Sequence, residues 1–239
     1  MEHLAARLAA ISGVECVALG GSRATGTARA HSDWDFGLYY RDAIDPDDVR
    51  ALGFDGEVFA PNEWGRVPNG GAWLVVEDQR VDLIYRDLAV VDTWTADAAA
   101  GKFQVFREVG YIAGAPTYSY AAELAINRHL VGTLPRPAFP DALRQAAPPY
   151  WQRIRDGALE FADGHARRND TTACAGNLAI AAIAEAHRRL CARAEWYLNH
   201  KDLIERAGLA AAQPILRTLG DDLLDAVARM RRVLALVPR

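Results

Sequence analysis

Residues 20–40, GGSRATGTARAHSDWDFGLYY, carry the most informative pattern in the chain. They follow an apolar, β-prone run at Val14–Leu19 and end in a second apolar run, which predicts a strand over Asp35–Tyr40. Alternate residues of a strand project from the same face, so Asp33 and Asp35 are expected to place two carboxylates side by side. Two like charges at that spacing are unfavourable unless a cation lies between them, and magnesium binds carboxylates together with phosphate oxygens. The pattern therefore predicts a magnesium site at the start of this strand.

The turn between the two predicted strands has the composition of a phosphate-binding site. Gly20 and Gly21 allow a tight turn and a close approach of the backbone to a ligand. Ser22 stands at the predicted start of a helix, where unpaired backbone N–H groups and a hydroxyl can bind phosphate oxygens. Arg23 follows directly, and its guanidinium can either approach a phosphate or pair with a surface carboxylate. We therefore expect Gly21, Ser22 and Arg23 to form a phosphate-binding site.

The order of these features resembles a known superfamily of enzymes. A strand, Gly-Gly-Ser, a short polar segment and Asp-x-Asp opening an apolar strand are the signature of the DNA polymerase beta-like nucleotidyltransferase superfamily, which residues 14–86 resemble. The resemblance implies that Gly21 and Ser22 hold the β- and γ-phosphates of a nucleoside triphosphate. It also implies that Asp33 and Asp35 bind Mg²⁺.

That superfamily uses a third carboxylate on a neighbouring strand, and Asp82 in the stretch RVDLIYR is the matching position. The resemblance implies that Asp82 is a third metal ligand, the general base for an acceptor hydroxyl, or both. The alternative is an ordinary carboxylate near the end of a hairpin, because Ala72–Val76 and Val81–Tyr85 flank a polar turn. We therefore expect Asp33, Asp35 and Asp82 to be the catalytic and metal-binding residues.

The chain divides into two parts that differ in composition and charge. Residues 1–116 carry 10 basic and 18 acidic residues, whereas residues 117–239 carry 17 basic and 13 acidic residues, so the net charges are −8 and +4. Strand patterns are confined to the first part, and from Tyr118 onward apolar residues recur at helical spacing. We expect an α+β protein, with a nucleotidyltransferase domain containing a mixed sheet at residues 1–116 and a helical bundle at residues 117–239.

The stretch EWYLNHKD at residues 195–202 is the strongest candidate for a contribution of the helical part to the triphosphate site. Lys201 is one of two lysines among 27 basic residues and can neutralise triphosphate charge, and Asn199 can donate a hydrogen bond to phosphate or sugar. The alternative is a solvated Lys201 that follows aromatic residues of the core. The carboxylates of Glu123 and Glu185 fall in predicted Ala-rich helices and are expected at the surface.

The two-part layout resembles the antibiotic-modifying nucleotidyltransferases that act on aminoglycosides and lincosamides. It implies transfer of a nucleoside monophosphate, with ATP as the expected donor, to a hydroxyl of a small molecule such as an aminoglycoside-like antibiotic. The acidic first part would attract a polycationic acceptor. Two alternatives stay open. One is nucleotidylation of a protein or a tRNA, as in toxin–antitoxin relatives, and the other is a nucleotide-binding module without catalysis.

Composition argues against several other classes of protein. Hydrophobic residues make up 51% and charged residues 24% of the chain, which are globular proportions. The three cysteines, Cys16, Cys174 and Cys191, form no CxxC pair, which argues against a disulfide framework and for a reducing cytoplasm. No signal-peptide pattern opens the sequence and the apolar runs are short, so no membrane partner is expected. A pI of about 5.9 argues against a nucleic-acid partner.

Overall fold

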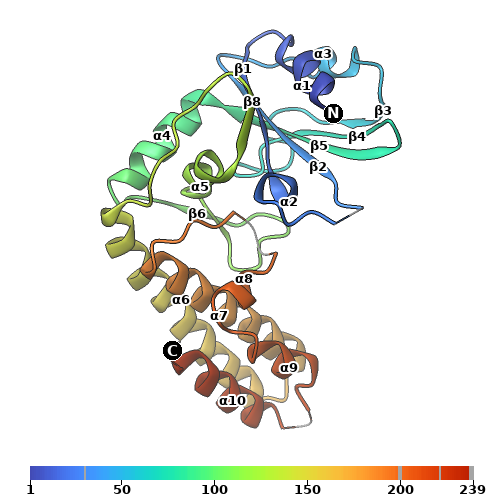
Figure 1. Cartoon of the computed structure of the whole chain (residues 1–239). Coiled ribbons are helices and arrows are strands. Elements are labelled where there is room, and N and C mark those ends of the chain that lie inside the picture. The colour runs from blue at the N-terminus through green and yellow to red at the C-terminus, as the bar shows by residue number, and fades with distance from the viewer. Residues whose placement is uncertain (30, 199–200, 221, 237–239) are drawn as a thin grey trace. The chain divides into compact units, whose positions relative to one another are not determined.

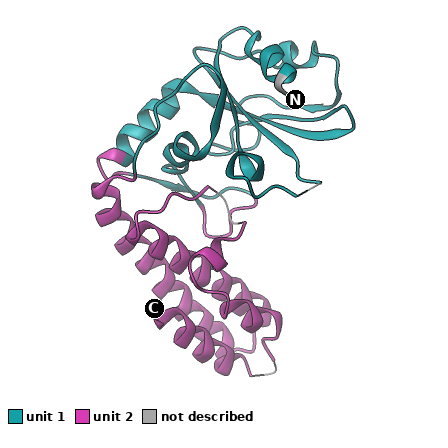
Figure 2. Ribbon diagram, in the orientation of Figure 1, with its two compact units in different colours: residues 1–98, 103–109, 115–138 teal, residues 99–102, 110–114, 139–239 magenta. Residues whose placement is uncertain are grey.

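The computed structural model describes residues 1–29, 31–198, 201–220 and 222–236. The chain forms two compact units, which Figure 2 distinguishes by colour. The first unit comprises residues 1–98, 103–109 and 115–138, and the second comprises residues 99–102, 110–114 and 139–239. Each unit has a hydrophobic core of its own.

The first unit is built on a six-stranded mixed sheet (Figure 1). The strand order is β3-β4-β5-β2-β1-β8, in which β2 and β5 run parallel and the other neighbouring pairs run antiparallel. The α+β class and the mixed sheet that the sequence predicts are thereby confirmed. The strands are β1 (Val14–Leu19), β2 (Trp34–Tyr40), β3 (Asp55–Val58), β4 (Gly71–Val76), β5 (Gln79–Asp87) and β8 (Arg128–Val131), and a separate ribbon pairs β6 (Val105–Phe106) with β7 (Ala115–Pro116).

One face of the sheet packs against α1 (Glu2–Ala9) and α3 (Pro46–Arg50). Alternate strand residues such as Leu83 point into this core, where they meet Leu4 and Leu8 of α1 with essentially no exposed surface. Burying each leucine side chain stabilises the fold by roughly 1.5–3 kcal/mol. Because this face takes every second residue of β5, the residues between them, including Asp82, lie on the opposite face.

The opposite face carries a buried ion pair between β5 and α5 (Ser119–Ile126). Nε and Nη2 of Arg86 donate to the two carboxylate oxygens of Glu123, at 2.6 and 2.5 Å. The same guanidinium lies 4.7 Å from the ring centroid of Tyr120 and donates to the carbonyl of Pro68. The expectation that Glu123 lies at the surface is wrong, since its carboxylate compensates an arginine buried by the helix.

Strand β8 extends the first unit beyond the boundary expected at residue 116. It pairs antiparallel with β1, with Val131 opposite Val17 and Arg128 opposite Leu19. The helical spacing expected from Tyr118 onward is therefore confirmed for α5 and wrong for the residues after Asn127, which form β8. A four-residue strand is too short to display an alternating pattern, and here pairing with β1 decides the conformation.

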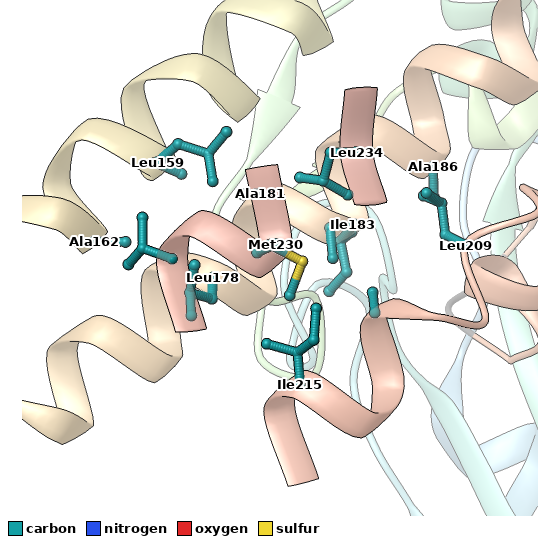
Figure 3. Packing of buried hydrophobic residues seen from close by; sticks show 14 of the residues in the cluster. Leu159, Ala162, Leu178, Ala181, Ile183, Ala186, Leu209, Ile215, Met230 and Leu234 are labelled. Atoms are coloured by element: carbon teal, nitrogen blue, oxygen red, sulfur yellow. The ribbon is translucent and has the colours of Figure 1, made fainter. Parts of the chain in front are cut away.

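The second unit is a bundle of helices (Figure 1). Two long helices, α6 (Asp141–Arg167) and α7 (Thr171–Ala192), pack against each other and against α10 (Leu223–Ala235). Two short helices complete it, α8 (Leu203–Arg206) and α9 (Ala212–Arg217). Figure 3 shows how α6, α7, α9 and α10 bring Leu159, Leu178, Ile215 and Met230 together in the core. None of the helices in the described residues has the length and apolar character needed to span a membrane.

Helix α6 begins at Asp141 and contains Pro148 and Pro149. Each proline lacks an N–H and disturbs the preceding helical turn. The fully buried side chains of Leu143 and Trp151 on either side hold the two segments in one helix.

Glu185 lies at the centre of a buried arginine cluster in the second unit. Its carboxylate accepts hydrogen bonds from Arg155 at 2.8 Å, Arg188 at 2.7 Å and Arg189 at 2.7 Å. Arg189 also donates to the carbonyl of Leu236 at 2.6 Å, which ties α7 to the end of α10. Burial alone would raise the pKa of Glu185, but the arginine hydrogen bonds outweigh it and hold that pKa below its ordinary value. The expectation that Glu185 lies at the surface is wrong.

Candidate active site

Two of the predicted carboxylates lie beside each other on neighbouring strands. Asp35 of β2 is the register partner of Asp82 of β5 in the parallel pair. Neighbouring strands are about 4.8 Å apart, and residues in register project from the same face. Phe36 and Leu83, the residues that follow each aspartate, are fully buried in the core on the other face. Both half-buried carboxylates are therefore directed to the face of the sheet that α1 and α3 leave uncovered.

The glycine turn after β1 lies directly against Asp35. Gly21 has a φ of +58°, and a β-carbon at this position would lie 1.9 Å from Oδ2 of Asp35. Only glycine fits there without moving the carboxylate. The backbone N–H of Gly20 donates to the carbonyl oxygen of Asp35 at 2.7 Å. The turn predicted to bind phosphate and a carboxylate predicted to bind magnesium are thus in contact.

Ser22 and Arg23 belong to α2 (Gly21–Thr25), a single helical turn that follows the glycines. Ser22 is half-buried. Arg23 donates from Nη2 to the carbonyl of Ser32 at 2.7 Å and from Nε to the carbonyl of Asp33 at 3.2 Å. Its guanidinium also lies 4.1 Å from the ring centroid of Trp34. Arg23 therefore fixes the end of the loop that carries Asp33, while a contact of Arg23 with phosphate stays a prediction.

Asp33, immediately before β2, forms an ion pair with Arg80 of β5. Oδ1 of Asp33 lies 2.7 Å from Nε of Arg80, although the pair lacks hydrogen-bond geometry. The Arg80 side chain is 72% exposed and the Asp33 side chain 35%, so solvent weakens this pair. The carboxylate of Asp33 is thus directed to a cation that the protein itself provides.

The described residues contain no group of three or more His, Cys, Asp or Glu side chains arranged to hold a metal ion. Asp35 and Asp82 nevertheless offer adjacent carboxylate oxygens, the kind of ligand that Mg²⁺ prefers. The donors therefore fit magnesium in chemical type. The third predicted carboxylate, Asp33, is paired with Arg80 through Oδ1.

No model of a known protein family matches the chain, and no curated protein matches it in sequence. Among solved structures, the chain is similar to a crystal structure of a nucleotidyltransferase-like protein from Exiguobacterium sibiricum 255-15. The TM-score is 0.43 and the sequence identity 10%, over 97% of this chain and 72% of that chain. A similarity of this size does not establish an activity, so the site rests on the geometry given above.

The residues predicted from the helical part have a different status. Lys201 is exposed and belongs to the second compact unit, and Asn199 lies outside the described residues. Tyr197 is buried in the core of the helical unit, as the alternative interpretation of this stretch expects. The assignment of Asn199 and Lys201 to the triphosphate stays a prediction.

The sequence-based interpretation missed an aromatic residue in the same row as the carboxylates. Trp73 of β4 is the register partner of Asp82, and 51% of it is exposed. The hairpin itself could have identified Trp73. Its turn pairs Val76 with Gln79, and three residues further along each strand Trp73 pairs with Asp82. The ion pair of Asp33 with Arg80 had no comparable signal, since it depends on side-chain orientation.

Proposed function

We propose that this chain is a magnesium-dependent nucleotidyltransferase that transfers a nucleoside monophosphate from a nucleoside triphosphate to a hydroxyl of a small molecule and releases pyrophosphate. The observation that supports this most directly is the contact of the Gly20–Gly21 turn with the carboxylate of Asp35, next to Asp82. A phosphate-binding turn beside paired carboxylates suits a metal-bound triphosphate.

In the proposed reaction the backbone at Gly21 and the hydroxyl of Ser22 bind the β- and γ-phosphates. Asp35 and Asp82, joined by Asp33, would hold Mg²⁺, which would neutralise phosphate charge and stabilise the leaving pyrophosphate. A carboxylate oxygen of Asp82 accepts the proton of the acceptor hydroxyl. The acceptor oxygen then forms a bond to the α-phosphorus as the bond to the pyrophosphate oxygen breaks.

We propose an aminoglycoside-like molecule as the acceptor. The net charge of −8 on residues 1–116 supports a cationic acceptor, because an acidic surface raises the local concentration of cations. The pair of Asp35 and Asp82 contributes to that charge, so the acceptor is supported less directly than the nucleotide site.

A thermal-shift titration with ATP, GTP, CTP and UTP, each with and without Mg²⁺, tests the nucleotide site. A ligand at one hundred times its Kd stabilises the native state by about 2.7 kcal/mol. We expect a magnesium-dependent increase in Tm with at least one nucleotide, which identifies the donor. Asp55→Asn, at an exposed position of β3, is the matched control and should retain the increase. The absence of a shift with all four nucleotides would contradict the proposal.

A further inference from the structure

Three aromatic rings form an ordered cluster at the β3–β4 side of the sheet. The rings of Trp64 and Trp73 stack with centroids 5.3 Å apart and planes 16° from parallel. Phe59 contacts both, at 5.2 Å from Trp64 and 4.8 Å from Trp73. Trp64 stacks on one face of the Trp73 indole and Phe59 contacts it edge-on, yet half of Trp73 remains exposed. A rigid aromatic surface open to solvent is well suited to binding a ligand by stacking.

The exposed indole belongs to the same row of the sheet as the catalytic carboxylates. Trp73 is in register with Asp82 on one side and with Glu57 on the other, and Asp82 is in register with Asp35. With strands about 4.8 Å apart, Trp73 lies one strand from Asp82 and two strands from Asp35. A ligand of the size of one sugar ring can therefore contact the indole and reach the carboxylates.

The face around Trp73 is strongly acidic. Glu57 is exposed beside it, and Asp55 lies two residues earlier on β3, in register with Val75. The arginines of β5 on this face, Arg80 and Arg86, are paired with Asp33 and Glu123. Negative charge around the face of a tryptophan favours a cation, because the ring itself attracts positive charge. The same charge disfavours a triphosphate.

We propose that Trp73 and Glu57 form the acceptor subsite, and that the acceptor is an organic cation whose amine-bearing ring stacks on the indole of Trp73. The assignment rests on the proposed nucleotidyl transfer for its place in the reaction. Binding of the cation itself depends only on the aromatic and acidic residues of β3 and β4.

The order of the strands supports this assignment. The glycine turn follows β1, Asp35 lies on β2, Asp82 on β5 and Trp73 on β4, so the carboxylates lie between the turn and the indole. In an in-line displacement the attacking and leaving oxygens are on opposite sides of the phosphorus. With pyrophosphate held at the turn, an acceptor on Trp73 would approach the phosphorus from the opposite side, as this displacement needs.

Two ring compounds that differ in charge test the subsite. We would measure the Kd of the full chain for trans-1,4-diaminocyclohexane and for trans-1,4-cyclohexanediol by ligand-observed NMR, without nucleotide. We expect the diamine to bind at least tenfold more tightly than the diol. Trp73→Ala should weaken diamine binding at least fivefold, and Glu57→Gln two- to fivefold, because stacking and charge both contribute. Trp73→Phe keeps an aromatic ring and should retain most of the affinity.

Val75→Ala is the matched control, since Val75 is on the same strand and face and is 47% exposed. It should leave diamine binding unchanged. Equal binding of diamine and diol, or unchanged diamine binding in Trp73→Ala, would overturn the proposal. Dissociation of a wild-type dimer by Trp73→Ala in sedimentation would also overturn it, because a second copy would then occupy the surface. If the diamine results hold and no nucleotide binds, the cation site at Trp73 and Glu57 stands, and its assignment to an acceptor fails with the proposed transfer.

Discussion

Asp35 and Asp82 face each other in register across the parallel strands β2 and β5, and the backbone of Gly21 lies against Asp35. This arrangement brings together residues that are 47 positions apart in the sequence. It concentrates negative charge next to a turn that suits phosphate, which is favourable when a divalent cation lies between the two.

Asp82→Asn should remove the stabilisation that Mg²⁺ and nucleotide give together, because the amide supplies no negative charge to the metal. At a ligand concentration that stabilises the wild type by about 2.7 kcal/mol, most of that increase should be lost. The Tm without ligand reports separately on the fold, whose core packing should be unchanged because Asp82 is outside the apolar core. Thermal unfolding with and without ligand measures both, and a full magnesium-dependent shift in Asp82→Asn would exclude it as a ligand.

Gly21→Ala should destabilise the chain more than Gly26→Ala. Both glycines have positive φ, so an alanine at either costs roughly 1–2 kcal/mol in the left-handed conformation. Only at Gly21 does the new β-carbon collide with Asp35, whereas the β-carbon at Gly26 meets nothing within 4 Å. Urea unfolding of the two variants isolates the collision. Equal free energies of unfolding would show that Asp35 moves aside without cost.

Arg80→Gln should increase the affinity for Mg²⁺ if Asp33 is a ligand. The substitution removes the positive charge 2.7 Å from Asp33 and so leaves its carboxylate available to a metal. Exposed ion pairs contribute up to about 1 kcal/mol, which corresponds to a two- to fivefold change in Kd. Calorimetric titration with Mg²⁺ measures the Kd of the two proteins. Arg50→Gln, which removes another exposed ion pair, is the control. An unchanged or weaker affinity would indicate that Asp33 does not bind the metal.

Glu185→Gln should strongly destabilise the helical unit. Removing one charge from a buried pair costs about 3–5 kcal/mol, and here three arginines lose their carboxylate. Asp163→Asn breaks an exposed ion pair with Arg167 and should cost no more than about 0.5 kcal/mol. Guanidinium unfolding at pH 7 compares the two. Similar small costs in both variants would contradict the importance of the cluster.

The same carboxylate predicts a pH dependence. The pKa of Glu185 is lower in the folded chain than its ordinary value of 4.5, so the unfolded chain binds its proton more readily. Its contribution to stability is therefore complete above about pH 4.5 and is lost as the pH falls through the folded pKa. As the pH is lowered below about 4.5, Glu185→Gln should therefore lose less stability than the wild type, as measured by thermal unfolding. Parallel curves would show that other groups dominate acid unfolding.

The sequence predicted those parts of the fold and site that depend on local pattern. Apolar, β-prone runs predicted β1 and β2, and two such runs around a polar turn predicted the β4–β5 hairpin that carries Asp82. Residues whose environment depends on distant partners were misjudged. Glu123 and Glu185 looked like surface charges because the arginines that compensate them come from other elements or turns.

The surface formed by Trp73 and Glu57 was missed for a related reason. Trp73 has an apolar side chain, which by itself suggests a place in the core. Only its pairing with Asp82 across β4 and β5 places it on the exposed face of the sheet. Strand β3, which supplies Glu57, is four residues long and follows no pattern that single-sequence reasoning detects. The pairing of residues across the strands, and not the composition, thus shows that Trp73 and Glu57 share a face with Asp82.

Calorimetric titration of the non-cleavable analogue α,β-methylene-ATP, with Mg²⁺ present and absent, tests the central claim most directly. Should the thermal shifts identify another base, the corresponding analogue replaces it. The account predicts magnesium-dependent binding to the wild type and to Asp55→Asn, and at least a hundredfold loss of affinity in Asp35→Asn, about 2.7 kcal/mol. Binding that is independent of Mg²⁺, or that Asp35→Asn leaves unchanged, would contradict a triphosphate site built on Asp35 and Asp82.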